Sequence, residues 1–146
     1  MAIDVKVETE IERGPADVAA FAMEAENDPD WIGGISTARR LTPPPTAVGT
    51  RVERVATFLG RRIEYVMDVV ELVPHERIVL KSVKAPFPMR VTYEFVPRGV
   101  NTLASVRVEG EPAGFYKVAG GLMAPAVKRN LNGDLKRLKA IVESGD

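Results

Sequence analysis

The feature that most constrains the fold is a run of short alternating segments between Gly49 and Gly110. Polar and apolar residues alternate there with a period of two, which is typical of a half-buried β-strand. Turn residues separate the segments, which predicts strands at about 50–58, 62–72, 77–83, 89–97 and 102–110. Because the turns are short, we expect neighbouring strands to pair antiparallel.

Two more strands and two short helices are expected before this meander. Residues 3–11 alternate strictly and predict a strand, and residues 35–41 predict a weaker one. Gly14-Pro15 and Asn27-Asp28-Pro29 are typical of helix starts, so one helix is expected from Pro15 to about Ala25 and a helical turn near Trp31.

A long helix is expected after the meander, from Gly114 to about Glu143. Its apolar stripe consists of Val127, Leu131, Leu135, Leu138 and Val142. Gly120, Gly121 and Pro125 predict a bend near Ala124. The chain is therefore expected to form one α+β domain over residues 1–146, a curved antiparallel sheet of about seven strands wrapped around the long C-terminal helix.

A two-residue hairpin loop at Gly60 predicts which side chains face the helix. Such a loop pairs even positions of one strand with odd positions of the next. The predicted inner face of these two strands consists of Val52, Arg54, Ala56, Phe58, Ile63, Tyr65, Met67 and Val69. By the same alternation Met89, Val91, Tyr93 and Phe95 point inward.

Composition excludes several classes of site and partner. The chain has no cysteine, so disulfides, thiolate zinc sites and cysteine nucleophiles are excluded, and its single histidine, His75, excludes sites with two imidazoles. Basic and acidic residues number 20 each and alternate along the strands, so no nucleic-acid partner is expected. We find no catalytic constellation and expect no cofactor and no metal.

No apolar run approaches the length of a membrane span, and the first residues do not form a signal peptide. The sequence thus predicts a protein without a transmembrane segment, located in the cytoplasm.

The order of these elements resembles the START-like (SRPBCC) superfamily, which includes the birch-pollen allergen family and bacterial polyketide cyclase/dehydrase-type proteins. The resemblance covers essentially the whole chain and rests on residues 15–21, 27–31, 48–50, 60–61, 71–74 and 135–139. It implies a helix-grip fold with a ligand cavity between the sheet and the long helix. Members bind lipids, sterols, polyketides, quinones or hormones, and a minority catalyse cyclisation or aromatisation. The superfamily brings no fixed catalytic motif.

A cavity is also expected on physical grounds, because a strongly bent sheet cannot collapse completely onto one helix. The candidate ligand-binding residues are Trp31, Arg54, Ala56, Phe58, Tyr65, Met67, Phe87, Met89, Val91, Tyr93, Phe115, Ala119, Leu122 and Met123. The methionines either line the cavity or pack in an ordinary core. Trp31 either caps the cavity mouth or packs in the core. Gly120 and Gly121 serve either as a hinge for ligand entry or in close helix-to-sheet packing.

Arg54 is the least expected member of the apolar face, since a buried guanidinium needs a partner. It either anchors a ligand carboxylate or enolate, reaches water at the cavity rim, or pairs with a carboxylate from the N-terminal helices. A three-residue loop at Gly60 would instead turn it outward. The hydroxyls of Tyr65 and Tyr93 bind either a ligand or protein groups. Asp28 and His75 are interpreted as a helix-capping residue in a solvated loop and a solvated turn residue.

These features predict a protein that binds or transports a small hydrophobic ligand, lipid-like, polyketide or aromatic, in an internal cavity. Two alternatives remain open. One is a polyketide cyclase or dehydratase-like enzyme, in which Tyr65 or Tyr93 moves a proton and Arg54 stabilises an enolate. The other is a homodimeric interaction module.

Overall fold

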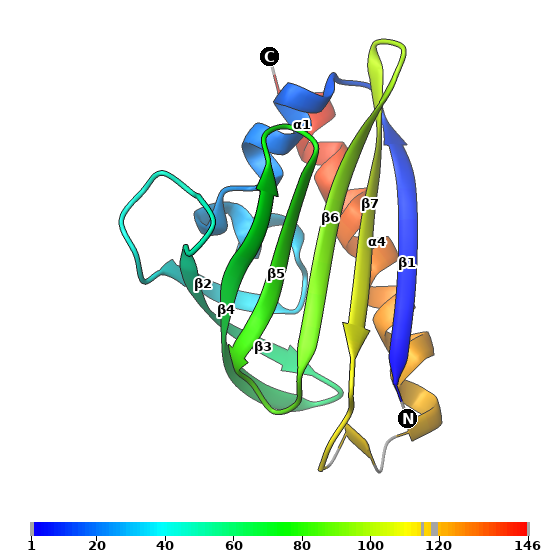
Figure 1. Ribbon diagram of the computed structural model, residues 1–146. Coiled ribbons are helices and arrows are strands. Elements are labelled where there is room, and N and C mark those ends of the chain that lie inside the picture. Colours follow the sequence, from blue (N-terminus) through cyan, green and yellow to red (C-terminus); the bar gives the residue numbers. More distant parts are fainter. Residues whose placement is uncertain (1, 115, 118–119, 146) are drawn as a thin grey trace.

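The computed structural model describes residues 2–114, 116–117 and 120–145. Its main element is a seven-stranded antiparallel sheet in the order β1-β7-β6-β5-β4-β3-β2 (Figure 1). The strands are β1 (Ile3–Ile11), β2 (Ile35–Arg40), β3 (Arg51–Phe58), β4 (Arg61–Val73), β5 (Arg77–Lys84), β6 (Met89–Arg98) and β7 (Asn101–Gly110). All seven strands expected from the alternation are confirmed, and no strand end differs from its predicted position by more than one residue.

The register between β3 and β4 is set by a two-residue turn, Leu59-Gly60. Both residues have positive φ, 49° and 76°, as a type I′ hairpin turn requires. Phe58 therefore pairs with Arg61, and Arg54 lies opposite Tyr65. The predicted inner face is confirmed, and the alternative in which Arg54 faces outward is wrong.

The short helices follow β1. Helix α1 (Pro15–Ala22) begins after the N-cap Gly14 with proline in its first turn, as predicted. The chain then forms a 3-10 helix, η1 (Ala25–Asn27), and a single turn, α2 (Asp28–Trp31). This turn carries Asp28 and Trp31 toward the interior, where both are buried.

The long helix α4 runs from Met123 to Ser144, and the 3-10 helix η2 (Gly120–Leu122) precedes it. Of the long helix predicted from Gly114, residues 116–117 are helical and the continuous α-helix begins at Met123. Pro125 lies in the first turn of α4, where no intrahelical N–H bond is lost. The bend expected near Ala124 stays a prediction. A Cβ added at Gly121 would meet no atom within 4 Å, so close packing does not explain this glycine.

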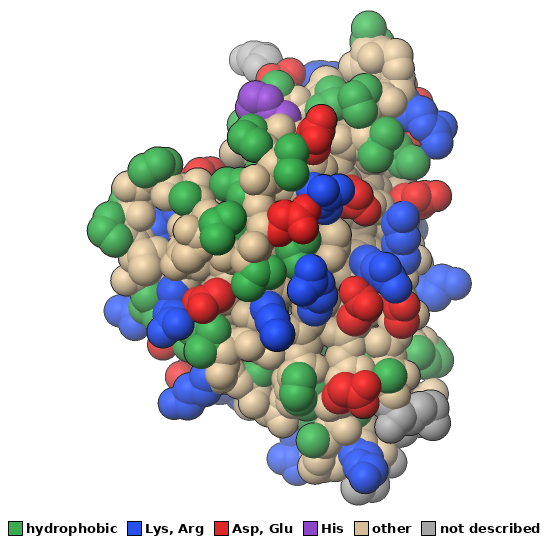
Figure 2. All heavy atoms as spheres, in the orientation of Figure 1, with side chains coloured by type: hydrophobic (Ala, Val, Ile, Leu, Met, Phe, Trp, Pro, Cys, Tyr) green, Lys and Arg blue, Asp and Glu red, His purple; other side chains and the backbone are tan. Residues whose placement is uncertain are grey.

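Helix α4 and the short helices cover one face of the curled sheet (Figure 1). Helix α4 packs mainly on β1, with further contacts to β7, α1 and α2. Figure 2 shows that basic and acidic side chains intermingle on the opposite face. Within the described part of the chain, no helix has the length and apolar character needed to cross a membrane.

We predict that Gly60→Ala destabilises the fold by about 1 kcal/mol, because a residue with a Cβ is strained at φ 76°. Urea unfolding followed by circular dichroism measures the change. Gly121→Ala is the matched control, since nothing surrounds that position, and its stability should stay near that of the wild type. Equal stability of the Gly60 variant and the control would contradict this account of the hairpin.

Candidate functional site

A cavity of about 150 Å³ lies between the inner face of the sheet and α4. Its wall is mostly apolar, and α2, β3, β4, β6, β7 and α4 all contribute to it. Two members of this lining, Thr57 of β3 and Asn130 of α4, are exposed. The hollow interior expected from the bent sheet is present.

Ten of the candidate residues line this cavity: Trp31, Arg54, Ala56, Phe58, Tyr65, Phe87, Met89, Val91, Tyr93 and Met123. Met67 is fully buried in the core and does not border the cavity. Leu122 was wrongly placed in the lining, because it lies at the end of η2 with its side chain 68% exposed. Phe115 and Ala119 lie outside the described residues. Ligand contact by any of these side chains stays a prediction.

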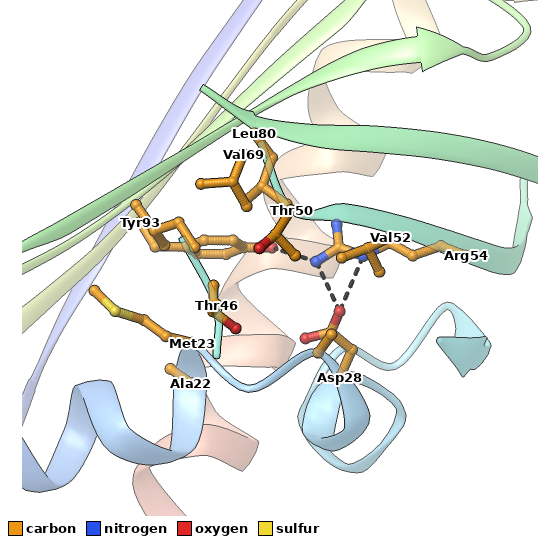
Figure 3. A pocket seen from close by; sticks show the side chains of 12 residues that line it. Ala22, Met23, Asp28, Thr46, Thr50, Val52, Arg54, Val69, Leu80 and Tyr93 are labelled. Carbon is orange, nitrogen blue, oxygen red and sulfur yellow. Dashed lines mark hydrogen bonds and ion pairs between the residues drawn. The ribbon is translucent and has the colours of Figure 1, made fainter. Parts of the chain in front are cut away.

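The polar part of the wall centres on a buried ion pair between Arg54 and Asp28 (Figure 3). Arg54 Nη2 lies 2.8 Å from Asp28 Oδ2, and Nε donates to the same oxygen at 3.0 Å. Both side chains are about 5% exposed. The alternative in which Arg54 pairs with a carboxylate of the N-terminal helices is therefore confirmed, and the interpretation of Asp28 as a solvated capping residue is wrong.

This pair is charged although it is buried. Burial opposes the charge on Arg54, but Asp28 beside it keeps the pKa of the guanidinium well above its ordinary value. Burial raises the pKa of Asp28, and the positive charge of Arg54 opposes that rise. The attraction between the two groups thus recovers only part of the cost of removing Asp28 from water.

Tyr93 and Tyr65 are both neighbours of Arg54. Arg54 Nη2 donates to the Tyr93 hydroxyl oxygen at 3.5 Å, and Tyr65 pairs with Arg54 across β3 and β4. Burial raises the pKa of Tyr93 to about 12 and raises that of Tyr65 as well. Both phenols therefore stay protonated at neutral pH, as poor bases but available hydrogen-bond donors.

Asp134 on α4 brings a second buried carboxylate to the lining. Its Oδ1 accepts hydrogen bonds from the backbone N–H of Gly33 at 3.0 Å and from Arg137 at 2.6 Å. Burial raises the pKa of Asp134, against the lowering effect of these two donors. Arg137 also donates to the carbonyl oxygen of Trp31, so α4 holds the end of α2 in place.

Trp31 is 1% exposed and lines the cavity, with its ring edge-on to Tyr93 at a centroid distance of 5.6 Å. Among the described residues, its indole N–H has no hydrogen-bond partner. An unpaired buried donor costs about 1–3 kcal/mol. Trp31 is thus both a packing residue and an unused donor in the cavity wall.

A smaller pocket of about 20 Å³ lies on the other side of Arg54, bordered by Thr46, Thr50 and Val52 (Figure 3). This volume fits one water molecule. Arg54 and Asp28 also line this pocket, so a water molecule held there could form a hydrogen bond with the ion pair. It is too small for an organic ligand.

The sequence reasoning missed Asp134, although a signal was present. Asp134 follows Val127 by seven residues and Leu131 by three, which places it on the buried stripe of α4. A carboxylate on an apolar stripe indicates a buried polar site. It also missed Ile32, Gly34 and Thr57, which line the cavity from segments expected to be loops or strand ends.

The described residues contain no group of three or more side chains that could hold a metal ion. The cavity can accommodate an apolar molecule, with Arg54, Tyr65, Tyr93 and Asp134 as the polar side chains of its buried wall.

The family described as polyketide cyclase / dehydrase and lipid transport matches residues 2–143. The chain belongs to this family. Its fold is the START-like helix grip, which the resemblance implied. No curated protein matches the sequence significantly.

Solved structures share this fold at low sequence identity. The protein TTHA0849 from Thermus thermophilus is 20% identical, with a TM-score of 0.85 over 97% of this chain and 98% of that one. The Zhui aromatase/cyclase from Streptomyces sp. R1128 is 14% identical, with a TM-score of 0.83 over 98% and 94%. The START superfamily protein from Mycobacterium smegmatis is 17% identical, with a TM-score of 0.81 over 97% of both chains.

We predict that Asp28→Asn destabilises the protein by about 3–5 kcal/mol, because it leaves the Arg54 charge buried without a counter-ion. The midpoint of urea unfolding should fall accordingly. Asp30→Asn is the matched control on the same helical turn, where the side chain is exposed, and should change stability by less than about 0.5 kcal/mol. Similar stability of both variants would show that the ion pair does not hold the site together.

Proposed function

We propose that this protein binds and carries a small hydrophobic ligand in the cavity between the sheet and α4. The observation that supports this most directly is the cavity itself, about 150 Å³ and lined mostly by apolar side chains with a few polar groups at one wall. Ligand sites have this composition, whereas ordinary cores have few voids larger than a water molecule.

The size of the cavity favours a modest ligand. A dry apolar cavity of about 150 Å³ holds a molecule the size of benzene. A larger lipid-like or polyketide ligand would have to displace part of the lining or extend out of the cavity. The single turn α2 and the half-buried Ile32 contribute to this lining, so modest shifts there would enlarge the cavity.

A second candidate function is a cyclase or dehydratase-like reaction in the same cavity. The family description and the similarity to an aromatase/cyclase support it. In this reaction Asp134 or a tyrosine would move a proton, and Arg54 would stabilise negative charge on an enolate. The raised pKa values of Tyr65 and Tyr93 weaken this candidate, and so does the engagement of Arg54 with Asp28.

Native mass spectrometry of protein purified from its own cells distinguishes the two candidates. A co-purified apolar compound is expected, and it should remain chemically unchanged when it is returned to ligand-free protein. A change in its mass or absorption spectrum on the protein would favour catalysis.

Location in the cytoplasm and homodimer formation stay predictions. Light scattering tests homodimer formation by comparing the mass in solution with the chain mass of 15.9 kDa.

We predict that Ala56→Phe abolishes ligand binding by filling the cavity. Ala56 lines it, and the added ring would occupy much of its volume. Ethylbenzene, monitored by NMR shifts of the methionine methyl groups, should bind at least about tenfold more weakly than to the wild type. The variant should stay folded, because the ring enters empty space.

Val55→Phe is the matched control for this substitution. It adds the same ring at the neighbouring position of β3, which points to the opposite face of the sheet. Ethylbenzene should bind this control as it binds the wild type. If both variants bound ethylbenzene normally, the proposed cavity would not be the ligand site.

A further inference from the structure

We propose, on the basis of that ligand-binding function, that the cavity selects neutral, single-ring alcohols whose hydroxyl group donates a hydrogen bond to Oδ2 of Asp134. Three observations lead to this ligand class: the unused oxygen of a buried carboxylate, the charge balance of the polar wall and the cavity volume.

Asp134 brings a carboxylate with one unused oxygen to the cavity. The residue is 4% exposed and lines the cavity. Its Oδ1 accepts both of its hydrogen bonds, from the backbone N–H of Gly33 and from Arg137. Within the described part of the chain no donor binds Oδ2. Unlike the indole nitrogen of Trp31, which is enclosed without accessible surface, Oδ2 retains some. This oxygen can therefore accept a hydrogen bond from a ligand.

The surroundings of the carboxylate place Oδ2 on the cavity side. The two donors to Oδ1 lie toward solvent, since Gly33 is exposed and the Arg137 side chain is 45% exposed. The two oxygens of a carboxylate diverge, so Oδ2 points away from these donors. Burial raises the pKa of Tyr65, and the charge of Asp134 raises it further. Burial also raises the pKa of Asp134, and the charge of Arg54 is among the effects that oppose this rise. Both partners line the cavity, which agrees with a carboxylate that faces it.

A hydroxyl group is the ligand group that suits this oxygen. An ionised carboxylate only accepts hydrogen bonds, and bonds from O–H groups to carboxylates are among the strong ones. A ketone or ether oxygen would instead bring a second acceptor against Oδ2. An alcohol supplies the donor without adding a charge to the site.

The charge balance favours a neutral ligand. Arg54 pairs with Asp28 at one part of the polar wall, and Arg137 pairs with Asp134 at another, so two positive and two negative formal charges compensate each other. A ligand ion of either sign would lose its water without meeting an uncompensated charge. This argues against the idea that Arg54 anchors an acidic ligand.

The volume limits the remainder of the ligand. About 150 Å³ fits one aromatic ring with a short substituent. Apolar side chains such as Ala56, Val91 and Val127 surround this space and contact the ring without hydrogen bonds.

Four probes with one ring each test this class. Benzyl alcohol and ethylbenzene differ only by a hydroxyl in place of a methyl group, acetophenone carries an acceptor without a donor, and benzoate carries a charge. The methyl shifts of Met89 and Met123, which line the cavity, report binding in an NMR titration. Benzoate should bind the wild type at least about tenfold more weakly than benzyl alcohol.

The variant Asp134→Asn separates the hydrogen bond from the hydration of each probe. Asparagine has nearly the same shape, and its carbonyl oxygen can still accept from Gly33 and Arg137, but the amide group that replaces Oδ2 donates and does not accept. Benzyl alcohol should bind this variant about three- to tenfold more weakly than the wild type. Ethylbenzene should bind both proteins equally, and acetophenone should bind the variant equally or more tightly.

Two further measurements keep the test independent of the stability of that variant. Asp30→Asn removes the same charge from an exposed position and should bind all four probes as the wild type does. In the wild type itself, the methylene protons of benzyl alcohol should show nuclear Overhauser effects to the β protons of Asp134. Absence of these effects in a saturated complex would contradict the proposed contact.

Each other result has a distinct meaning. If Asp134→Asn weakens benzyl alcohol and ethylbenzene equally, or neither, Asp134 does not bind the hydroxyl and the ligand class is wrong. If benzoate binds the wild type as tightly as benzyl alcohol, the charge argument is wrong and with it the restriction to neutral ligands. In both cases binding of ethylbenzene leaves the proposed function intact. If no probe binds, the proposed function itself is overturned.

Discussion

The buried ion pair between Arg54 and Asp28 is the interaction on which the rest of the site depends. It joins β3, at the centre of the cavity wall, to the single turn α2, which has too few residues to be stable by itself. Trp31 lies in the same turn, three residues after Asp28, so the ion pair also positions the indole ring in the cavity. At its other end α2 is held by Arg137 of α4, through the Trp31 carbonyl. One short turn thus links the sheet, the long helix and the cavity lining.

The cavity follows from how α4 lies on the sheet. The helix contacts mainly β1 and β7, whereas the curled sheet continues through β6, β4 and β3 and moves away from it. Val127 and Leu131 face the resulting space, and Leu135 and Leu138, one and two turns further along, pack in the solid core. The same apolar stripe therefore lines the cavity in its first half and packs in the core in its second half.

Sequence reasoning predicted what depends on local rules. The alternation and the Leu59-Gly60 turn fix which side chains of β3 and β4 face inward, so the inward position of Arg54, Ala56 and Tyr65 followed from them. The partner of Arg54 did not follow, because Asp28 is 26 residues away and its local context also fits a helix cap.

Three further features show where local rules fail or were incompletely applied. The start of α4 at Met123, which places Pro125 in its first turn, was not visible in the sequence. Asp134 could have been predicted from its place on the apolar stripe. The missing partner of the Trp31 N–H depends on every neighbouring side chain at once, and no pattern in the sequence indicates it.

The intermingled charges of the outer face, together with a formal net charge of zero, have a consequence for how a ligand arrives. A protein without net charge exerts no overall attraction or repulsion on a distant charged solute. Uptake then resembles the partition of a solute from water into oil, with a rate that depends on diffusion and on the width of the opening. Ionic strength should have little influence on it, in contrast to proteins that attract their ligands electrostatically.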